Sequence, residues 1–146
     1  MIANSVKAAA VLSGADKLVE ENLYSYGRNL GLAFQVVDDI LDFTGSTEVL
    51  GKPSGLDLAS GKLTSPVFYA LKQQPFLKVL IQRELSEPED LDQALELIKD
   101  SDGIAQSRDL AKELAFKAAK NLNCLPASES TEAMRELTKY VVSRIC

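Results

Sequence analysis

Three aspartates in one short run, Asp38, Asp39 and Asp42, are the residues whose types and spacing best suit chemistry. On a helix Asp38 and Asp42 are four residues apart and share a face, with Gln35 three residues before Asp38. Two carboxylates one turn apart repel each other unless a cation lies between them. Oxygen ligands without histidine or thiolate favour Mg²⁺, which completes its shell with water and phosphate oxygens. The run therefore predicts a magnesium site for a phosphorylated ligand.

A plainer interpretation also fits the spacing, because a D-D-x-x-D run is commonly just the solvated face of a helix. The context favours a site, since the run interrupts an apolar stretch that includes Val36, Val37 and Ile40, where unpaired charge is costly. A glycine-rich loop that follows carries Lys52 and Lys62, and we expect it to fold back over the acidic face. If the aspartates bind no metal, both lysines are ordinary exposed loop residues.

Composition excludes several other kinds of site. The 146 residues contain no histidine, which rules out Ser-His-Asp systems and His-ligated zinc within this sequence. Sixteen basic against 21 acidic residues give a net charge of −5, which argues against a nucleic-acid partner. Cys124 and Cys146 are too far apart in sequence to form a C-x-x-C pair, and a reducing compartment fits best. No apolar run is long enough for a transmembrane segment, and no secretion signal is recognisable.

The elements that must position the aspartates are predicted to be helices, because apolar residues recur at intervals of three and four. We expect an all-α fold with one helical region over residues 1–146. The long helix that carries the aspartates should be followed by one long loop, residues 45–66, rich in glycine. Gly103 should end one of the later helices and so separate it from the next. The predicted helices cover residues 2–12, 16–43, 67–73, 75–85, 88–102, 103–122 and 128–145.

The run from Gly31 to Asp42 contains the pattern FQ-x-x-DD-x-x-D on a predicted helix, and three further motifs follow it. These are Gly51-Lys52-Pro53, Asp57-Leu58, and Gly61-Lys62-Leu63-Thr64-Ser65-Pro66. Together they resemble the second aspartate-rich region of the all-trans polyprenyl diphosphate synthases. The resemblance covers nearly the whole sequence and is closest to synthases of the solanesyl type from plastids and cyanobacteria. It implies the C-terminal half of the isoprenoid synthase helical fold.

The resemblance also implies roles for individual residues. It makes Asp38 a direct metal ligand, Asp42 a ligand mostly through water, and Asp39 the residue that orients this metal shell. Gln35 corresponds to an amide beside the substrate, and Phe34 to a side chain near the prenyl group.

In the same resemblance, Lys52 and Lys62 match catalytic lysines that neutralise the allylic diphosphate. The implied reaction elongates an allylic diphosphate with isopentenyl diphosphate, using Mg²⁺. The product is expected to be the side chain of a quinone such as plastoquinone. A homodimer or heteromer is expected for the full-length enzyme, in a plastid or another organelle, or in the cytoplasm of a bacterium.

One departure from the family pattern is important. The family's first D-D-x-x-D motif is absent from this sequence, so we expect no appreciable synthase turnover from this polypeptide alone. An alternative is a non-catalytic subunit that modifies the product length of a complete prenyl synthase, although such subunits often lose the second motif. A terpene cyclase-like or purely structural helical domain ranks lowest, because cyclases lack the combination of motifs found here.

Overall fold

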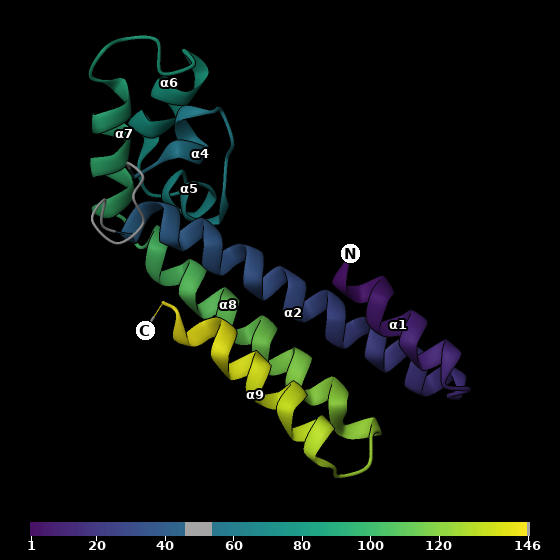
Figure 1. Cartoon of the computed structure of the whole chain (residues 1–146). Coiled ribbons are helices and arrows are strands. Elements are labelled where there is room, and N and C mark those ends of the chain that lie inside the picture. Colours follow the sequence, from purple (N-terminus) through teal and green to yellow (C-terminus); the bar gives the residue numbers. More distant parts are fainter. Residues whose placement is uncertain (46–53, 146) are drawn as a thin grey trace. The chain divides into compact units, whose positions relative to one another are not determined.

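The structure of the protein is a computed structural model that describes residues 1–45 and 54–145. Every regular element in these two stretches is a helix, which confirms the predicted all-α class (Figure 1). The α-helices are α1 (Ile2–Leu12), α2 (Lys17–Thr44), α4 (Leu56–Ala59), α5 (Ser65–Ala70), α6 (Pro75–Gln82), α7 (Asp90–Lys99), α8 (Gly103–Asn121) and α9 (Glu129–Ser143). A short 3₁₀ turn, η1 (Leu122–Cys124), lies between α8 and α9.

Several helix ends follow from local sequence. Gly14, with a φ of +73°, lies just beyond the end of α1, in a backbone conformation that glycine adopts at little cost. The side chain of Asp16 accepts a hydrogen bond from the backbone N–H of Val19 at 2.9 Å and caps the start of α2. At α9, Ser128 accepts a hydrogen bond from the N–H of Thr131 at 3.1 Å. These ends agree with the predicted ones to within a residue or two.

The middle of the chain differs from the prediction at four helices, α4 to α7. The predicted loop over residues 45–66 contains α4, a four-residue helix whose Leu58 is buried in the core. Its stability comes from this packing, because so short a helix has almost no stability of its own. Helices α5, α6 and α7 each end about three residues earlier than predicted, and α5 begins two residues earlier and α7 two residues later.

The break between α7 and α8 falls where it was predicted, just before Gly103, and this glycine also has a packing role. It is the first residue of α8, and a Cβ atom built on it would lie 2.4 Å from the carbonyl oxygen of Pro66 and 3.3 Å from the backbone nitrogen of Ala70. Gly103 is therefore required because α5 passes too close for any side chain.

The chain divides into two compact units, and both boundaries fall inside long helices. Unit 1 consists of Met1–Val37 and Leu110–Cys146, and unit 2 of Asp38–Asp109. The first boundary lies within α2 and the second within α8. The three aspartates of the predicted metal site all belong to unit 2.

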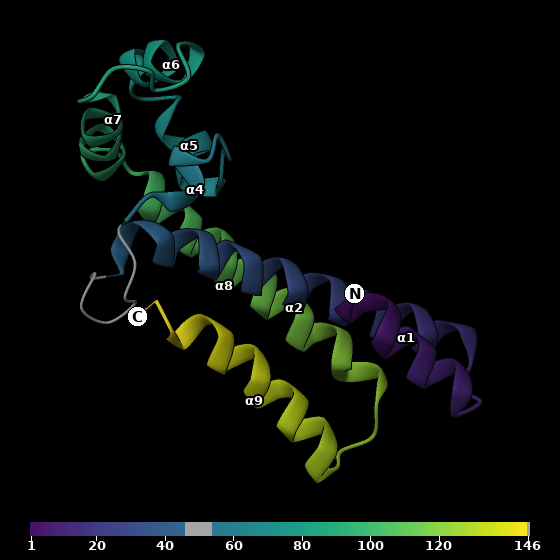
Figure 2. The same cartoon turned by 45° about the horizontal axis from the view of Figure 1, so that its top comes forward.

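Unit 1 is a layer of long helices in which α1 lies beside α2, and α8 lies between α2 and α9 (Figures 1 and 2). Close approach of α1 to α2 depends on Gly27, because a Cβ there would lie 2.8 Å from the Cα of Ala3. The hydroxyl of Tyr26 donates a hydrogen bond to the carbonyl oxygen of Met134 at 3.1 Å and ties α2 to α9.

Unit 2 is built from short helices around one apolar cluster. Helix α7 contacts both α5 and α6. An ion pair between Arg83 and Asp90 joins the end of α6 to the start of α7; the Asp90 side chain is only 1% exposed, whereas that of Arg83 is 41% exposed. The cluster consists of Phe43, Leu58, Val67, Ala70, Leu77, Leu80, Ala94 and Ile98.

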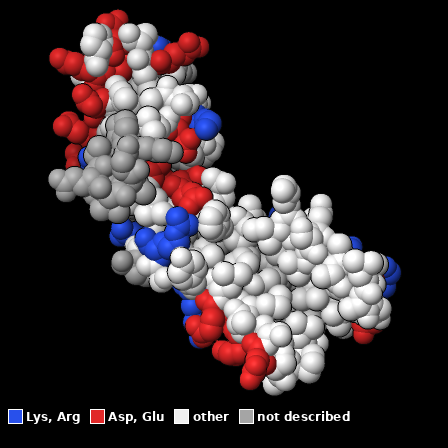
Figure 3. Space-filling view, in the orientation of Figure 1, with Lys and Arg blue, Asp and Glu red and all other residues white. Residues whose placement is uncertain are grey.

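Charge is unevenly divided between the units. By sequence, unit 2 has 14 acidic and 7 basic residues and a net charge of −7, whereas unit 1 has 7 acidic and 9 basic residues and a net charge of +2. Figure 3 shows acidic side chains gathered over α7 and the segment that joins α6 to α7. Unit 2 therefore provides a negative potential that favours cations.

Candidate metal and diphosphate site

The last two turns of α2 hold the three predicted aspartates in the expected arrangement. Asp38 and Asp42 are one helical turn apart and lie on the same face of α2. Both side chains are partly exposed, whereas Asp39 is 8% exposed. The exposed pair can therefore reach a ligand in solvent, and Asp39 supports the helix end from inside.

The segment that contains α4 returns to the end of α2 and contacts Asp42. The N–H of Gly55 donates to the carbonyl oxygen of Asp42 at 2.9 Å. The N–H of Asp57 donates to the Asp42 carboxylate at 3.2 Å. Gly55 has a φ of +77°, in the left-handed region that favours glycine, and this turn directs the N–H groups toward Asp42. The backbone thus fixes the position of one of the two partly exposed carboxylates.

Burial raises the pKa of Asp42 above its ordinary value of 3.8, and the nearby negative charges of Asp57 and Asp39 add to this rise. Hydrogen bonds from the backbone of Asp57 and Leu56 act in the opposite direction but do not cancel it. The ionised form of Asp42 is therefore disfavoured by partial desolvation and by like charge. A bound cation would relieve both effects.

Asp57 also connects Asp42 to the predicted catalytic lysine. The Lys62 ammonium lies 3.0 Å from the Asp57 carboxylate. The backbone N–H of Lys62 also donates a hydrogen bond to the backbone carbonyl oxygen of Asp57 at 2.8 Å. The Lys62 side chain remains 68% exposed. Asp42, Asp57 and Lys62 therefore form a continuous chain of contacts. Lys62 is brought close to the acidic helix end through Asp57.

Asp39 contacts the segment that follows Lys62 in sequence. The N–H of Ser65 lies 3.5 Å from the Asp39 carboxylate, at the limit of a hydrogen bond. Within the described part of the chain, the hydroxyl groups of Thr64 and Ser65 are buried and have no hydrogen-bond partner. Burying a hydroxyl without a partner is costly. A phosphate oxygen or a water molecule that accepted a hydrogen bond from them would remove this cost.

The residues present fit a magnesium ion shared with a phosphorylated ligand better than a metal held by protein alone. Among residues 1–45 and 54–145, no three acidic or cysteine side chains converge closely enough to bind a metal by themselves. Mg²⁺ commonly takes one or two carboxylates and completes its shell with water and phosphate oxygens. Asp38 and Asp42 provide such a pair, with oxygen ligands only.

The other predicted site residues lie elsewhere or outside the described part. Gln35 and Phe34 are exposed on the portion of α2 that belongs to unit 1. The Arg144 guanidinium lies 5.2 Å from the centroid of the Phe34 ring, within the range of a cation–π contact. Lys52 lies outside the described residues.

Asp57 and Arg144 contact predicted site residues, although the sequence analysis assigned neither of them a role. Asp57 has a recognisable signal, since it follows a Gly-x pair and lies five residues before Lys62, within reach across one short helix. Arg144 has no such signal, because its contact with Phe34 joins positions 110 residues apart.

Comparison with known proteins gives a consistent result. The family model described as polyprenyl synthetase matches residues 1–98, more than half of the chain. A prenyl transferase from Synechocystis sp. is 52% identical over 145 residues, which are 99% of this chain and 45% of that protein. Chloroplastic solanesyl diphosphate synthase 2 from Arabidopsis thaliana is 48% identical over 99% of this chain and 35% of its own length.

A solved structure agrees in both fold and sequence. The polyprenyl synthase from Caulobacter crescentus, complexed with calcium and isoprenyl diphosphate, superposes with a TM-score of 0.84 at 39% identity. The match covers 99% of this chain and 46% of that one. The chain thus spans less than half the length of these three relatives. No helix in the described ranges is long and apolar enough to cross a membrane. Because the family model matches more than half of the chain and these relatives agree with it, the chain belongs to the polyprenyl synthetase family.

Proposed function

We propose that this chain provides the second metal-binding helix of a long-chain trans-prenyltransferase, which condenses isopentenyl diphosphate with an allylic diphosphate. One observation carries the proposal: Asp38 and Asp42 share a face of α2, and Asp57 links Asp42 to Lys62. The two carboxylates can bind a metal ion, and the Lys62 ammonium held by Asp57 can bind a diphosphate oxygen on that metal. The calcium and isoprenyl diphosphate bound to the Caulobacter relative support the same ligand class.

In the proposed reaction, Asp38 and Asp42 hold Mg²⁺, and Asp39 keeps the helix end in place. The metal supplies charge neutralisation for the departing diphosphate. Lys62 and Lys52 bind diphosphate oxygens and stabilise the negative charge that develops as the allylic carbon–oxygen bond breaks. Gln35 orients the substrate beside α2, and Phe34 packs against the prenyl chain. The double bond of isopentenyl diphosphate then attacks the allylic carbon, which forms the new carbon–carbon bond and leaves a carbocation. Loss of a proton from the neighbouring carbon turns this cation into a new double bond. The released diphosphate can accept that proton.

The finer assignment is a solanesyl-type product for a quinone such as plastoquinone, made in a plastid. Two chloroplastic solanesyl diphosphate synthases, at 48% identity, support this assignment. We further propose that turnover requires a polypeptide that carries a first D-D-x-x-D motif, in a homodimer or a heteromer. The presence of a single such motif in the 146 residues supports this requirement.

The decisive experiment measures Mg²⁺-dependent binding of geranylgeranyl diphosphate by calorimetry. We expect binding only with Mg²⁺ present. Asp38→Asn and Asp42→Asn should each weaken it at least tenfold, because each removes one metal ligand. The matched control is Asp92→Asn, an exposed acid of α7 in the same unit, which should leave affinity unchanged. Equal binding by the Asp38 and Asp92 variants would refute the metal site.

A second measurement tests the requirement for another polypeptide. Incorporation of labelled isopentenyl diphosphate should be absent with this chain alone and should appear when a polypeptide bearing the first motif is added. Elongation by the chain alone would contradict the requirement. If the chain instead shifts the product length of an already complete synthase, the non-catalytic subunit is the correct assignment.

A further inference from the structure

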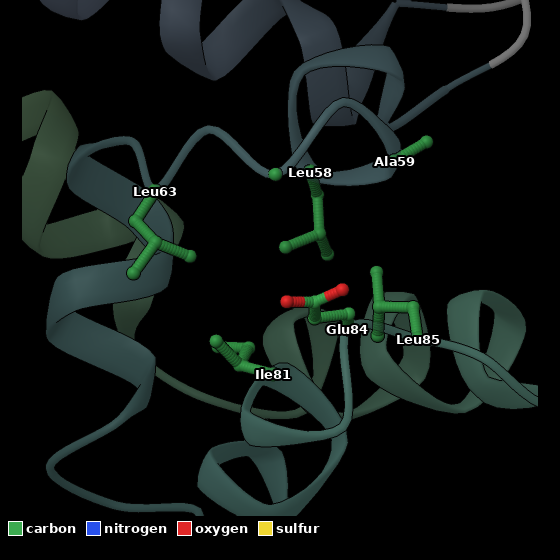
Figure 4. Close-up of a pocket in the computed structure, with 7 residues that line it drawn as sticks. Leu58, Ala59, Leu63, Ile81, Glu84 and Leu85 are labelled. Atoms are coloured by element: carbon green, nitrogen blue, oxygen red, sulfur yellow. The ribbon is translucent and has the colours of Figure 1, made fainter.

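Unit 2 contains a cavity of about 390 Å³ that the proposed reaction does not use. Leu58 and Leu63 line it on the side of α4 and the loop that follows, and Ile81, Glu84 and Leu85 line it from the end of α6 (Figure 4). The Glu84 carboxylate points into the space between Leu58 and Ile81. The volume is in the range of small-molecule sites, which combine apolar walls with a few polar groups.

The backbone that presents Glu84 is in an unfavourable conformation. Glu84 and Leu85 have φ values of +59° and +52°, in the left-handed region. The N–H of Leu85 bonds to the carbonyl oxygen of Leu80 at 3.1 Å, as in helix ends that normally carry glycine. Glycine would adopt this conformation at a lower cost. Unfavourable conformations of this kind are concentrated at binding sites.

The ion pair of Arg83 with the buried Asp90 holds this turn in place. Arg83 immediately precedes Glu84, and its guanidinium is bound to Asp90 through both carboxylate oxygens. The Asp90 carboxylate also accepts a hydrogen bond from the N–H of Glu87 at 3.2 Å. The turn is thus fixed on both sides of Glu84.

The charge of the cavity determines which ligand it suits. Glu84 is the one charged residue among those that line it, and no cationic side chain of the described residues lies within 4.0 Å of its carboxylate. Leucine and isoleucine walls offer no further oxygen ligands, so a metal ion would lack a coordination shell. A lipophilic anion would be repelled, both by Glu84 and by the net charge of −7 on unit 2.

We propose that this cavity binds a primary alkylammonium ion, with the ammonium group on Glu84 and the alkyl chain against Leu58, Leu63 and Ile81. A charge-assisted hydrogen bond would fix the head group, and burial of the chain would supply the hydrophobic part of the affinity. The cavity uses none of the side chains assigned to metal and diphosphate binding, and Leu58 and Leu63 directly follow Asp57 and Lys62 in sequence.

The test is a titration of methyl-labelled protein with hexylammonium chloride at pH 7, followed by NMR. The Ile81 methyl signal should shift and saturate, while that of Ile98, buried in the core of unit 2, should remain in place. Glu84→Gln should weaken the affinity at least tenfold. Glu96→Gln, which removes an exposed acid from α7, should leave it unchanged. 1-Hexanol, which has the same chain without the charge, should bind at least tenfold more weakly than hexylammonium.

Glu84→Gly is the second variant, because glycine favours the left-handed conformation and should raise the melting temperature while abolishing binding. Equal affinity for hexanol and hexylammonium would overturn the proposal. So would unchanged affinity in Glu84→Gly, or a titration in which Ile81 and Ile98 shift together without saturation.

Discussion

In unit 1 the described hydrogen bonds between α2 and its neighbours join neutral groups, and the cations Lys7 and Arg144 contact α2 only through the rings of Tyr24 and Phe34. In unit 2, by contrast, charged side chains join the segments. The Asn29 amide donates to the side chain of Asn121 at 3.2 Å, between α2 and α8. In unit 2, Asp42 accepts from the Asp57 backbone, and Arg83 pairs with the buried Asp90. The difference indicates that unit 1 serves as a helical frame, while unit 2 concentrates charge where we propose that ligands bind.

Replacing glycine with alanine should give the largest difference in stability between a change in unit 2 and a matched change in unit 1. Gly103→Ala should destabilise unit 2 by about 3 kcal/mol, because the added carbon meets the backbone of α5, which cannot move aside easily. Gly31→Ala in unit 1 is the matched control, since its added carbon would make an ordinary contact with Ile2 at 3.7 Å. That control should be neutral or stabilising by up to about 1 kcal/mol, because alanine favours the helix.

Urea denaturation, followed by circular dichroism, measures both variants. If Gly103→Ala were as stable as Gly31→Ala, the close approach of α5 to α8 would not be a property of the folded protein.

Removal of an ion pair should give the next largest contrast. Asp90→Ala should lower the free energy of unfolding by about 2 kcal/mol, because it leaves Arg83 partly buried without its partner. Glu113→Ala removes the exposed pair with Lys117 in unit 1, and should cost no more than about 0.5 kcal/mol. Thermal unfolding at low and high salt tests both. Similar losses in the two variants would show that burial does not distinguish these pairs.

The smallest expected effect is a pH dependence in unit 2. Because burial and like charge raise the pKa of Asp42 in the folded state, its ionised form destabilises the fold at pH 7. This destabilisation is present above the raised pKa, and it disappears as the pH falls through that value toward the ordinary 3.8. Asp42→Asn should therefore be more stable than wild type at pH 7, and the two should converge in acid.

Chemical denaturation at a series of pH values measures this difference, with Asp16→Asn in unit 1 as the control. Asp16 caps α2, so its replacement should not stabilise the protein at pH 7. A constant difference between wild type and Asp42→Asn at all pH values would contradict the assigned cause.

Most of the helices and the spacing of the aspartates could be predicted from sequence, because both depend on local periodicity and capping. The arrangement of Asp38 and Asp42 on one face needs only the geometry of a helix. Helix α4 could not be predicted, because it depends on burial of Leu58 against residues distant in sequence. The role of Gly103 depends on the close approach of α5, and glycine at a helix start gives no sign of a neighbouring backbone.

The contact between Arg144 and Phe34 provides a natural spectroscopic probe. Protons near a guanidinium that lies 5.2 Å from the centre of an aromatic ring experience its ring current, so their NMR frequencies depend on the ring's position. Isotope labelling of arginine alone would make this signal observable without a dye or a foreign tag. A lipid chain that displaced the ring, or inserted between ring and guanidinium, would move that resonance directly.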